Sequence, residues 1–160
     1  MKKRKRFVRD SQVEMTQLVL PNDTNYLGNL LGGRLMEWMD IAAAISAQRH
    51  SNRICVTAAV DNLVFHQPIR LGEVVTLRAS VNRVFGSSME VGVRVTAENQ
   101  LTGIRKTANT AYLTFVAVSE GGTPEKVDLI HPVTAEERRR YRQALVRRNS
   151  RLQQRRVTGR

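Results

Sequence analysis

Residues 34–48 read RLMEWMDIAAAISAQ, and this stretch decides the fold. It contains no Pro or Gly and only three charged residues, so nothing in it interrupts a helix. Small or apolar side chains cover nearly its whole helical circumference, and a helix of this kind is buried on almost every side. These side chains are Leu35, Met36, Met39, Ile41, Ala42, Ala43, Ala44, Ile45 and Ser46. We therefore expect a central helix enclosed by other elements.

The segments on either side of this helix predict strands. Before it, the strand EMTQLVL ends at the turn-rich PNDTN, and a loop through Gly28, Gly32 and Gly33 leads to the helix. After it, apolar and polar residues alternate from Val75 and again from Met89 to Ala97, and Gly86-Ser87 between them predicts a hairpin. The last long run becomes apolar on both faces from Ala111, as expected for a central strand. The predicted strands are residues 14–20, 55–65, 75–82, 89–97 and 104–118.

A buried helix followed by a meander of antiparallel strands is typical of an α+β fold in which a curved sheet wraps one helix. Such a sheet has open edges, so we expect two copies of the chain to pair. A second, basic helix is predicted to start at Thr134, because Thr134 and Glu137 match a capping box. We divide the chain into a basic N-terminal tail (1–10), one domain (11–133) and an Arg-rich C-terminal helix or tail (134–160).

The net charge of +12 is concentrated at the two ends of the chain. Residues 1–10 carry six Lys or Arg and one Asp, and residues 136–160 carry ten Arg and two Glu. The remaining 125 residues carry ten basic and eleven acidic side chains. Charge clustered at chain ends is usually solvated. The alternatives are binding to RNA, to anionic lipid or to a small polyanion.

Several functional classes find no support in the sequence. Cys55 is the single cysteine, and within ICVTAAV it is more typical of a small buried residue than of a nucleophile. His50, His66 and His131 lack metal-ligand spacing, and no zinc, dinucleotide or Walker motif is present. The longest uncharged run, Thr107–Ser119, is too short and polar to span a membrane. No apolar stretch follows the basic start, so we expect a cytoplasmic protein without a membrane partner.

Four blocks of the sequence resemble the hotdog-fold acyl-CoA thioesterases, the cytosolic acyl-CoA hydrolase family. They are DTNYLGNLLGGRLMEWMD (23–40), CVTAAVDNLVFHQPIRLGE (55–73), VNRVFGSSMEVGVRVTAEN (81–99) and TANTAYLTFVAV (107–118). The tail AEERRRYRQ (135–143) also resembles the Arg-rich ends of some members. Many members have His where this chain has Leu31. The His ring of those members packs near the substrate, so this difference bears on which acyl chains the site accepts. The resemblance implies the hotdog fold and the hydrolysis of fatty acyl-CoA to free fatty acid and coenzyme A.

The resemblance also implies a homodimer, assembled further into a hexamer as a trimer of dimers. The reaction needs water and no cofactor, because coenzyme A is part of the substrate and product. Asn29 and Asp40 are the implied catalytic residues and work from opposite protomers. Asp40 acts either as a general base on water or as a nucleophile on the thioester, and Asn29 orients the water. Taken alone, Asp40 could be an exposed helical residue, and Gly28-Asn29 a turn.

Other implied site residues surround this pair. The backbone N–H groups of Gly32 and Gly33 begin the helix and suit a thioester oxygen that becomes an oxyanion. Coenzyme A needs hydroxyls, backbone donors and Arg, since it carries a diphosphate and a ribose phosphate. The matching positions are Thr57, Ala58 and Ala59 beside the pantetheine arm, and Gly86, Ser87, Ser88 and an Arg cluster containing Arg139 and Arg140 for the nucleotide end.

Other functions remain as alternatives. A non-catalytic acyl-CoA sensor on the same fold would lose Asp40 or Asn29, and this chain has both. A binder of RNA or of an anionic surface would use the basic ends, but the neutral body argues against a nucleic-acid partner. A dehydratase of the same fold would pair its acid with a His, and no His lies near Asp40 in the sequence.

Overall fold

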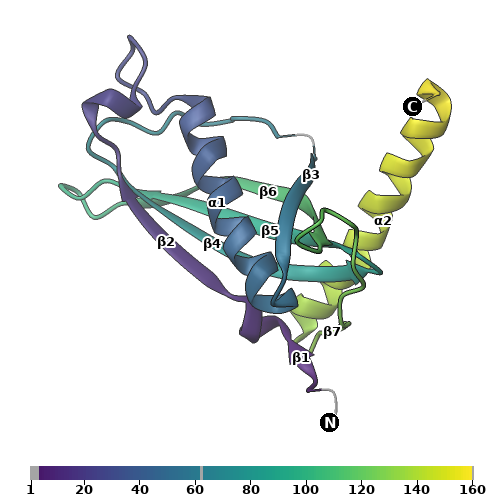
Figure 1. The fold of residues 1–160 in the computed structure, drawn as a ribbon. Coiled ribbons are helices and arrows are strands. Elements are labelled where there is room, and N and C mark those ends of the chain that lie inside the picture. The colour runs from purple at the N-terminus through teal and green to yellow at the C-terminus, as the bar shows by residue number, and fades with distance from the viewer. Residues whose placement is uncertain (1–3, 62, 160) are drawn as a thin grey trace.

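Helix α1 (Gly32–Ser51) is wrapped by a curled antiparallel sheet (Figure 1). The computed structural model describes residues 4–61 and 63–159. Its five-stranded sheet has the strand order β2-β4-β5-β6-β3, which confirms the predicted α+β architecture. The strands are β2 (Val13–Leu18), β3 (Ile54–Val60), β4 (Val74–Phe85), β5 (Ser88–Glu98) and β6 (Arg105–Val118). Short 3₁₀ helices, η1 (Val8–Ser11) and η2 (Pro21–Asp23), flank β2.

Helix α1 is buried against the sheet along most of its length. Ala42, Ala43 and Ala47 are fully buried, so the helix approaches the strands closely. The helix starts at Gly32 and ends at Ser51, and the next residue, Asn52, adopts the left-handed conformation common after a helix. Met36 and Ile41 are each 43% exposed. One apolar side of the central helix is therefore not covered by this chain.

The alternating segments form the predicted hairpin. In β4 the side chains of Val75, Leu77 and Val81 are fully buried on the side of α1. Strands β4 and β5 pair antiparallel from Val74 to Phe85, and Gly86 makes the reversal with φ +70°. Any residue with a side chain is strained at this backbone conformation, so glycine is favoured at this position.

Strand β3 is shorter than predicted. The sequence predicted a strand through Phe65, but the strand ends at Val60. The N–H of Asp61 still donates to the carbonyl of Tyr112 on β6, while its carboxylate binds Arg151 far along the chain. This side-chain contact lies directly after the end of the strand, and β-propensity alone does not reveal it.

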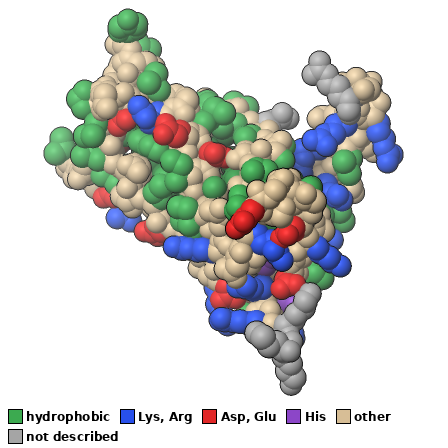
Figure 2. Space-filling model, viewed as in Figure 1, with side chains coloured by type: hydrophobic (Ala, Val, Ile, Leu, Met, Phe, Trp, Pro, Cys, Tyr) green, Lys and Arg blue, Asp and Glu red, His purple; other side chains and the backbone are tan. Residues whose placement is uncertain are grey.

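Both charged ends of the chain are attached to the domain. At the N-terminus, β1 (Arg6–Phe7) pairs in parallel with β7 (Ile130–His131). At the C-terminus, α2 (Ala135–Thr158) starts with the predicted capping box, in which Thr134 and Glu137 exchange hydrogen bonds. Figure 2 shows Lys and Arg side chains gathered along α2, whereas hydrophobic side chains gather over α1.

Candidate active site

Asp40 lies about two turns into α1 and is half-buried. The hydroxyl of Thr57, on β3, donates a hydrogen bond of 2.6 Å to Oδ1 of Asp40. This is the length of a charge-assisted hydrogen bond to a carboxylate. In the described part of the chain, Oδ2 of Asp40 accepts no hydrogen bond from protein groups. Asp40 is thus held in one orientation with one oxygen left for a water or a substrate.

A pocket of about 330 Å³ opens beside this carboxylate. Most of its wall is apolar, and α1, β3, β6 and the segment after β3 contribute to it. An apolar pocket with a few fixed polar groups is the usual form of a small-molecule site. Its lining residues are Gly33, Met36, Glu37, Met39, Asp40, Thr57, Val60, Leu63 and Leu113.

Asn29 stands in the loop before α1, and backbone hydrogen bonds fix its position. Its N–H binds the side chain of Asn25, and its carbonyl accepts from the N–H of Asn25. The next residue, Leu30, donates to the carbonyl of Ile69 at 2.7 Å. Oδ1 of Asn29 is buried and has no hydrogen-bond partner in the described structure. A buried amide oxygen without a partner is costly, so the absence of a partner for this atom within the described chain needs an explanation.

Gly32 and Gly33 form the first turn of α1, as predicted. The ring of Phe65 lies 3.3 Å from the position of a β-carbon on Gly32, so a side chain at Gly32 would press on this ring. Gly33 has no such neighbour and lines the pocket beside Asp40. The first N–H groups of a helix have no intrahelical acceptor and carry the positive end of the helix dipole.

The residues expected to bind coenzyme A fall into separate places in the single chain. Thr57 binds Asp40, and the pairing of β3 with β6 shifts register between Thr57 and Ala59, at Ala58. The turn Gly86-Ser87 is held by hydrogen bonds from Val127 and Ala117, and the hydroxyl of Ser88 donates to the carbonyl of Phe85.

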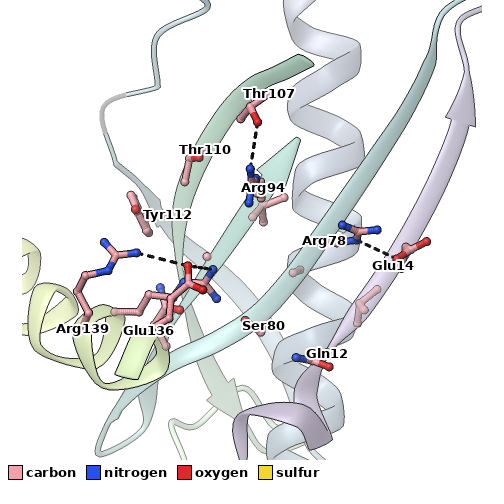
Figure 3. A pocket seen from close by; sticks show the side chains of 16 residues that line it. Gln12, Glu14, Arg78, Ser80, Arg94, Thr107, Thr110, Tyr112, Glu136 and Arg139 are labelled. Carbon is pink, nitrogen blue, oxygen red and sulfur yellow. Dashed lines mark hydrogen bonds and ion pairs between the residues drawn. The ribbon is translucent and has the colours of Figure 1, made fainter. Parts of the chain in front are cut away.

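Arg139 and Arg140 lie on the opposite side of the sheet from α1. Both pair with Glu136, and they line an open groove of about 730 Å³ between α2 and the outer face of the sheet (Figure 3). Figure 3 shows two further ion-pair or hydrogen-bond contacts in this groove, Arg78 with Glu14 and Arg94 with Thr107. None of the residues lining the groove lines the Asp40 pocket.

Sequence reasoning missed two features of the site. Thr57 was interpreted as a residue beside coenzyme A, and its bond to Asp40 was not anticipated. Its position in a strand next to the helix was the available signal. The sequence also did not predict two contacts, that of Arg147 with Glu90 and that of Arg151 with Asp61. Nothing in the sequence distinguishes these arginines from the solvent-exposed arginines beside them.

A metal centre requires a group of ligating side chains, and a membrane-spanning helix requires a long apolar segment. Among residues 4–61 and 63–159, no three His, Cys, Asp or Glu side chains gather as they would around a metal ion. Within the same ranges, neither helix is long and apolar enough to cross a bilayer.

The chain is similar to acyl-CoA thioester hydrolases in sequence. The family model "Thioesterase superfamily" matches residues 27–104. A protein of Bacillus subtilis (strain 168) named an uncharacterized acyl-CoA thioester hydrolase is 42% identical over 151 residues, covering 94% of this chain and 88% of that protein. Acyl-coenzyme A thioesterase 11 of Mus musculus is 42% identical over 142 residues. That match covers 89% of this chain, which spans about a quarter of the mouse protein (24%).

Solved structures give the same result for the fold. An acyl-CoA hydrolase from Bacillus cereus has a TM-score of 0.92 at 35% identity, covering 98% of this chain and 95% of that one. A hexameric acyl-CoA thioesterase has a TM-score of 0.91 at 38% identity, with 95% and 97% covered. The Staphylococcus aureus acyl-CoA hydrolase, solved with butyryl coenzyme A and coenzyme A, has a TM-score of 0.88 at 32% identity, with 98% and 94% covered. The chain therefore has the hotdog fold and belongs to the thioesterase superfamily.

Proposed function

We propose that this protein hydrolyses the thioester of acyl-CoA to a free fatty acid and coenzyme A. One observation carries the proposal: a carboxylate held by a hydroxyl at 2.6 Å stands on the wall of an apolar pocket. The pocket suits an acyl chain, and the carboxylate suits the activation of water. The names of the relatives, which are acyl-CoA hydrolases and thioesterases, agree with this assignment.

In the proposed reaction Asp40 acts as a general base. It takes a proton from a water whose oxygen attacks the thioester carbonyl carbon. The carbonyl oxygen becomes an oxyanion, which the N–H groups of Gly32 and Gly33 stabilise. The carbon–sulfur bond then breaks, and the proton held by Asp40 passes to the leaving sulfur to give the thiol of coenzyme A. Direct attack by Asp40 on the thioester would instead form an anhydride that water cleaves afterwards.

The catalytic water needs a second partner, and we assign this role to Asn29 of a second protomer. Along an α-helix rising 1.5 Å per residue, Gly33 and Asp40 are separated by roughly 10 Å. Asn29 lies further back in the loop, so Asn29 and Asp40 of one chain are poorly placed to share a water at about 3 Å. A two-fold axis beside α1 would set each Asn29 against the other chain's Asp40. The partnerless Oδ1 of Asn29 supports this arrangement.

The exposed apolar surface also supports a homodimer. Strand β3 forms one edge of the sheet, and its side chains Ile54 and Val56 are 49% and 47% exposed. Tyr26 and Leu27, at the tip of the loop that carries Asn29, are fully or largely exposed. An exposed apolar strand edge beside an exposed apolar helix face is suited to pairing with a second copy. We further propose assembly of three dimers into a hexamer, the state named for one of the similar structures.

We assign the coenzyme A moiety to residues around the same site in the assembled protein. Thr57, Ala58 and Ala59 would lie along the pantetheine arm, because Thr57 already reaches Asp40. Gly86, Ser87 and Ser88, together with Arg139 and Arg140, would hold the phosphates, since a turn with hydroxyls and Arg side chains offers suitable donors. In one chain Arg139 and Arg140 lie on the outer face of the sheet, so they would serve a site completed by a neighbouring protomer.

The proposed function is tested by release of free thiol from acyl-CoA esters of increasing chain length. We expect the wild-type protein to hydrolyse at least one of them. We expect folded Asp40→Asn protein to lose at least about 100-fold in kcat, the scale for loss of a general base. Thiol release at the wild-type rate by folded Asp40→Asn protein would remove Asp40 from the mechanism. No hydrolysis of any ester by the wild-type protein would refute the function.

A further inference from the structure

Arginine side chains, together with the buried Ala144, join helix α2 to the outer face of the sheet. The carboxylate of Glu90, on β5, is fully buried and binds the guanidinium of Arg147 through two hydrogen bonds of 2.9 and 2.7 Å. The same guanidinium lies 3.6 Å from the ring centroid of Tyr112, on β6. Gly92 leaves room for Asn82, whose amide donates to Glu90 at 2.9 Å. This network fixes the position of α2.

One helical turn after Arg147, Arg151 reaches the end of β3. Its Nη1 binds both carboxylate oxygens of Asp61 at 2.8 Å. The two side chains are only 21% and 17% exposed, so this ion pair is shielded from solvent more than an ordinary surface pair. The backbone N–H of Asp61 donates to the carbonyl of Tyr112, the residue that Arg147 covers. Asp61 is therefore held by β6 and by α2 together.

Leu63 and Phe65 form part of the candidate active site. Leu63 lines the pocket beside Asp40. The ring of Phe65 packs close to Gly32, at the start of α1. Between them, the carbonyl of Val64 accepts a hydrogen bond from the side-chain amide of Asn109. A shift of this segment would thus move the wall of the apolar pocket and the first turn of the catalytic helix.

We propose that Arg151 is a positioning residue that sets acyl-chain selectivity through Asp61. The ion pair fixes where the chain leaves β3, and this fixes how far Leu63 stands from the pocket. The inference rests on the proposed function, because it assigns the pocket to the acyl chain. Under this proposal Arg151, which belongs to the Arg-rich C-terminal segment, acts on a residue of its own chain. This role differs from the binding of phosphates or polyanions.

The test compares Arg151→Ala with Arg155→Ala in the full-length protein. Arg155 lies one turn further along α2, is exposed, and has no side-chain partner in the described structure. The ratio of kcat/KM is measured for butyryl-, octanoyl- and palmitoyl-CoA. We expect Arg151→Ala to change the ratio between the best and the next substrate by about 10-fold, the discrimination that an apolar wall gives for small changes in chain length. We expect Arg155→Ala to keep the wild-type ratio.

Hydrogen exchange provides a readout that does not need activity. The amide of Asp61 is expected to exchange at least about 10-fold faster in Arg151→Ala than in Arg155→Ala, because its segment opens more often. If Arg151→Ala does not fold, the double variant Arg151→Asp with Asp61→Arg, in which the two charges are swapped, is measured instead. We expect this variant to have nearly the wild-type selectivity and nearly the wild-type rate of hydrogen exchange at residue 61.

The outcomes separate the two proposals. Unchanged selectivity and unchanged exchange in folded Arg151→Ala would overturn the positioning role while leaving the hydrolase assignment intact. Equal effects of Arg151→Ala and Arg155→Ala would also overturn it. A wild-type protein that hydrolyses none of the three esters would refute the proposed function, and the assignment of selectivity to Arg151 would fall with it.

Discussion

The hydroxyl of Thr57 determines how the Asp40 carboxylate is presented to the pocket. Its hydrogen bond of 2.6 Å fixes one oxygen of the carboxylate and so orients the other. We predict that Thr57→Val, which keeps the β-branched shape, lowers kcat by about 10- to 100-fold, within the range for a disturbed general base. Thr57→Ser keeps the hydroxyl and should retain most of the activity. Equal kcat values for folded Thr57→Val and Thr57→Ser would contradict the role of the hydroxyl.

His50, near the end of α1, is expected to make the free energy of unfolding depend on pH. Burial lowers the pKa of His50 below its usual value, and Arg6 lowers it further, against a raising effect of the hydrogen bond with the carbonyl of Asp128. Its Nδ1 is buried without a partner in the described structure, so a proton there would meet no acceptor.

The unfolded chain therefore binds more protons at this residue than the folded chain between the lowered folded pKa and about pH 6.5. We predict that the free energy of unfolding falls as the pH decreases from about 7 through the folded pKa, and that it falls less in His50→Gln. Urea denaturation of both proteins at pH 7.5 and pH 5.5 measures this difference. Parallel losses in the two proteins would mean that His50 binds protons equally in both states.

At the scale of elements, the ion pair of Arg147 with the buried Glu90 helps to hold α2 on the sheet, beside the buried Ala144. Removing one partner of a buried pair leaves an uncompensated charge and costs about 3 kcal/mol or more. We predict that Arg147→Ala lowers the free energy of unfolding by about this amount, whereas Arg155→Ala changes it by less than about 0.5 kcal/mol. Chemical denaturation measures both values.

The double variant Glu90→Leu with Arg147→Leu tests the same pair in another way. It removes both charges and should recover much of the stability lost in Arg147→Ala, because no buried charge is left unpaired. A double variant as unstable as Arg147→Ala would show that packing, and not the buried charge, determines the loss.

The sequence predicted some elements well and others poorly, for physical reasons. Helix α1 and the β4–β5 hairpin could be predicted from the spacing of their apolar residues. Burial of one face or of all faces of an element determines this spacing directly. The docking of α2 could not be predicted, because its buried contacts use Arg147 and Arg151, and arginine is normally a surface residue. The early end of β3 was also missed, and the ion pair of Asp61 with Arg151 that lies next to it joins residues too far apart in the sequence to be recognised from a local pattern.

At the scale of the whole molecule, one chain carries the parts of the proposed site, which a second copy would complete. Asp40, Thr57 and the pocket are in place, and Asn29 has a buried oxygen without a partner in the described structure. The exposed apolar sides of α1 and β3 could be anticipated from a sheet wrapped around one helix. The proposed catalytic pair, Asn29 and Asp40, was chosen by family resemblance, because the local sequence around each is that of an ordinary turn or helix residue.

The shared site is tested most directly by mixing two inactive proteins. Asn29→Ala and Asp40→Asn subunits are dissociated, mixed in equal amounts and allowed to reassociate. Random pairing makes half of the dimers heterodimers, each with one intact site and one site lacking both residues. The account predicts that about a quarter of the wild-type thiol release returns, by this symmetry. Verified heterodimers that remain as inactive as their parents would show that Asn29 and Asp40 do not meet across the interface.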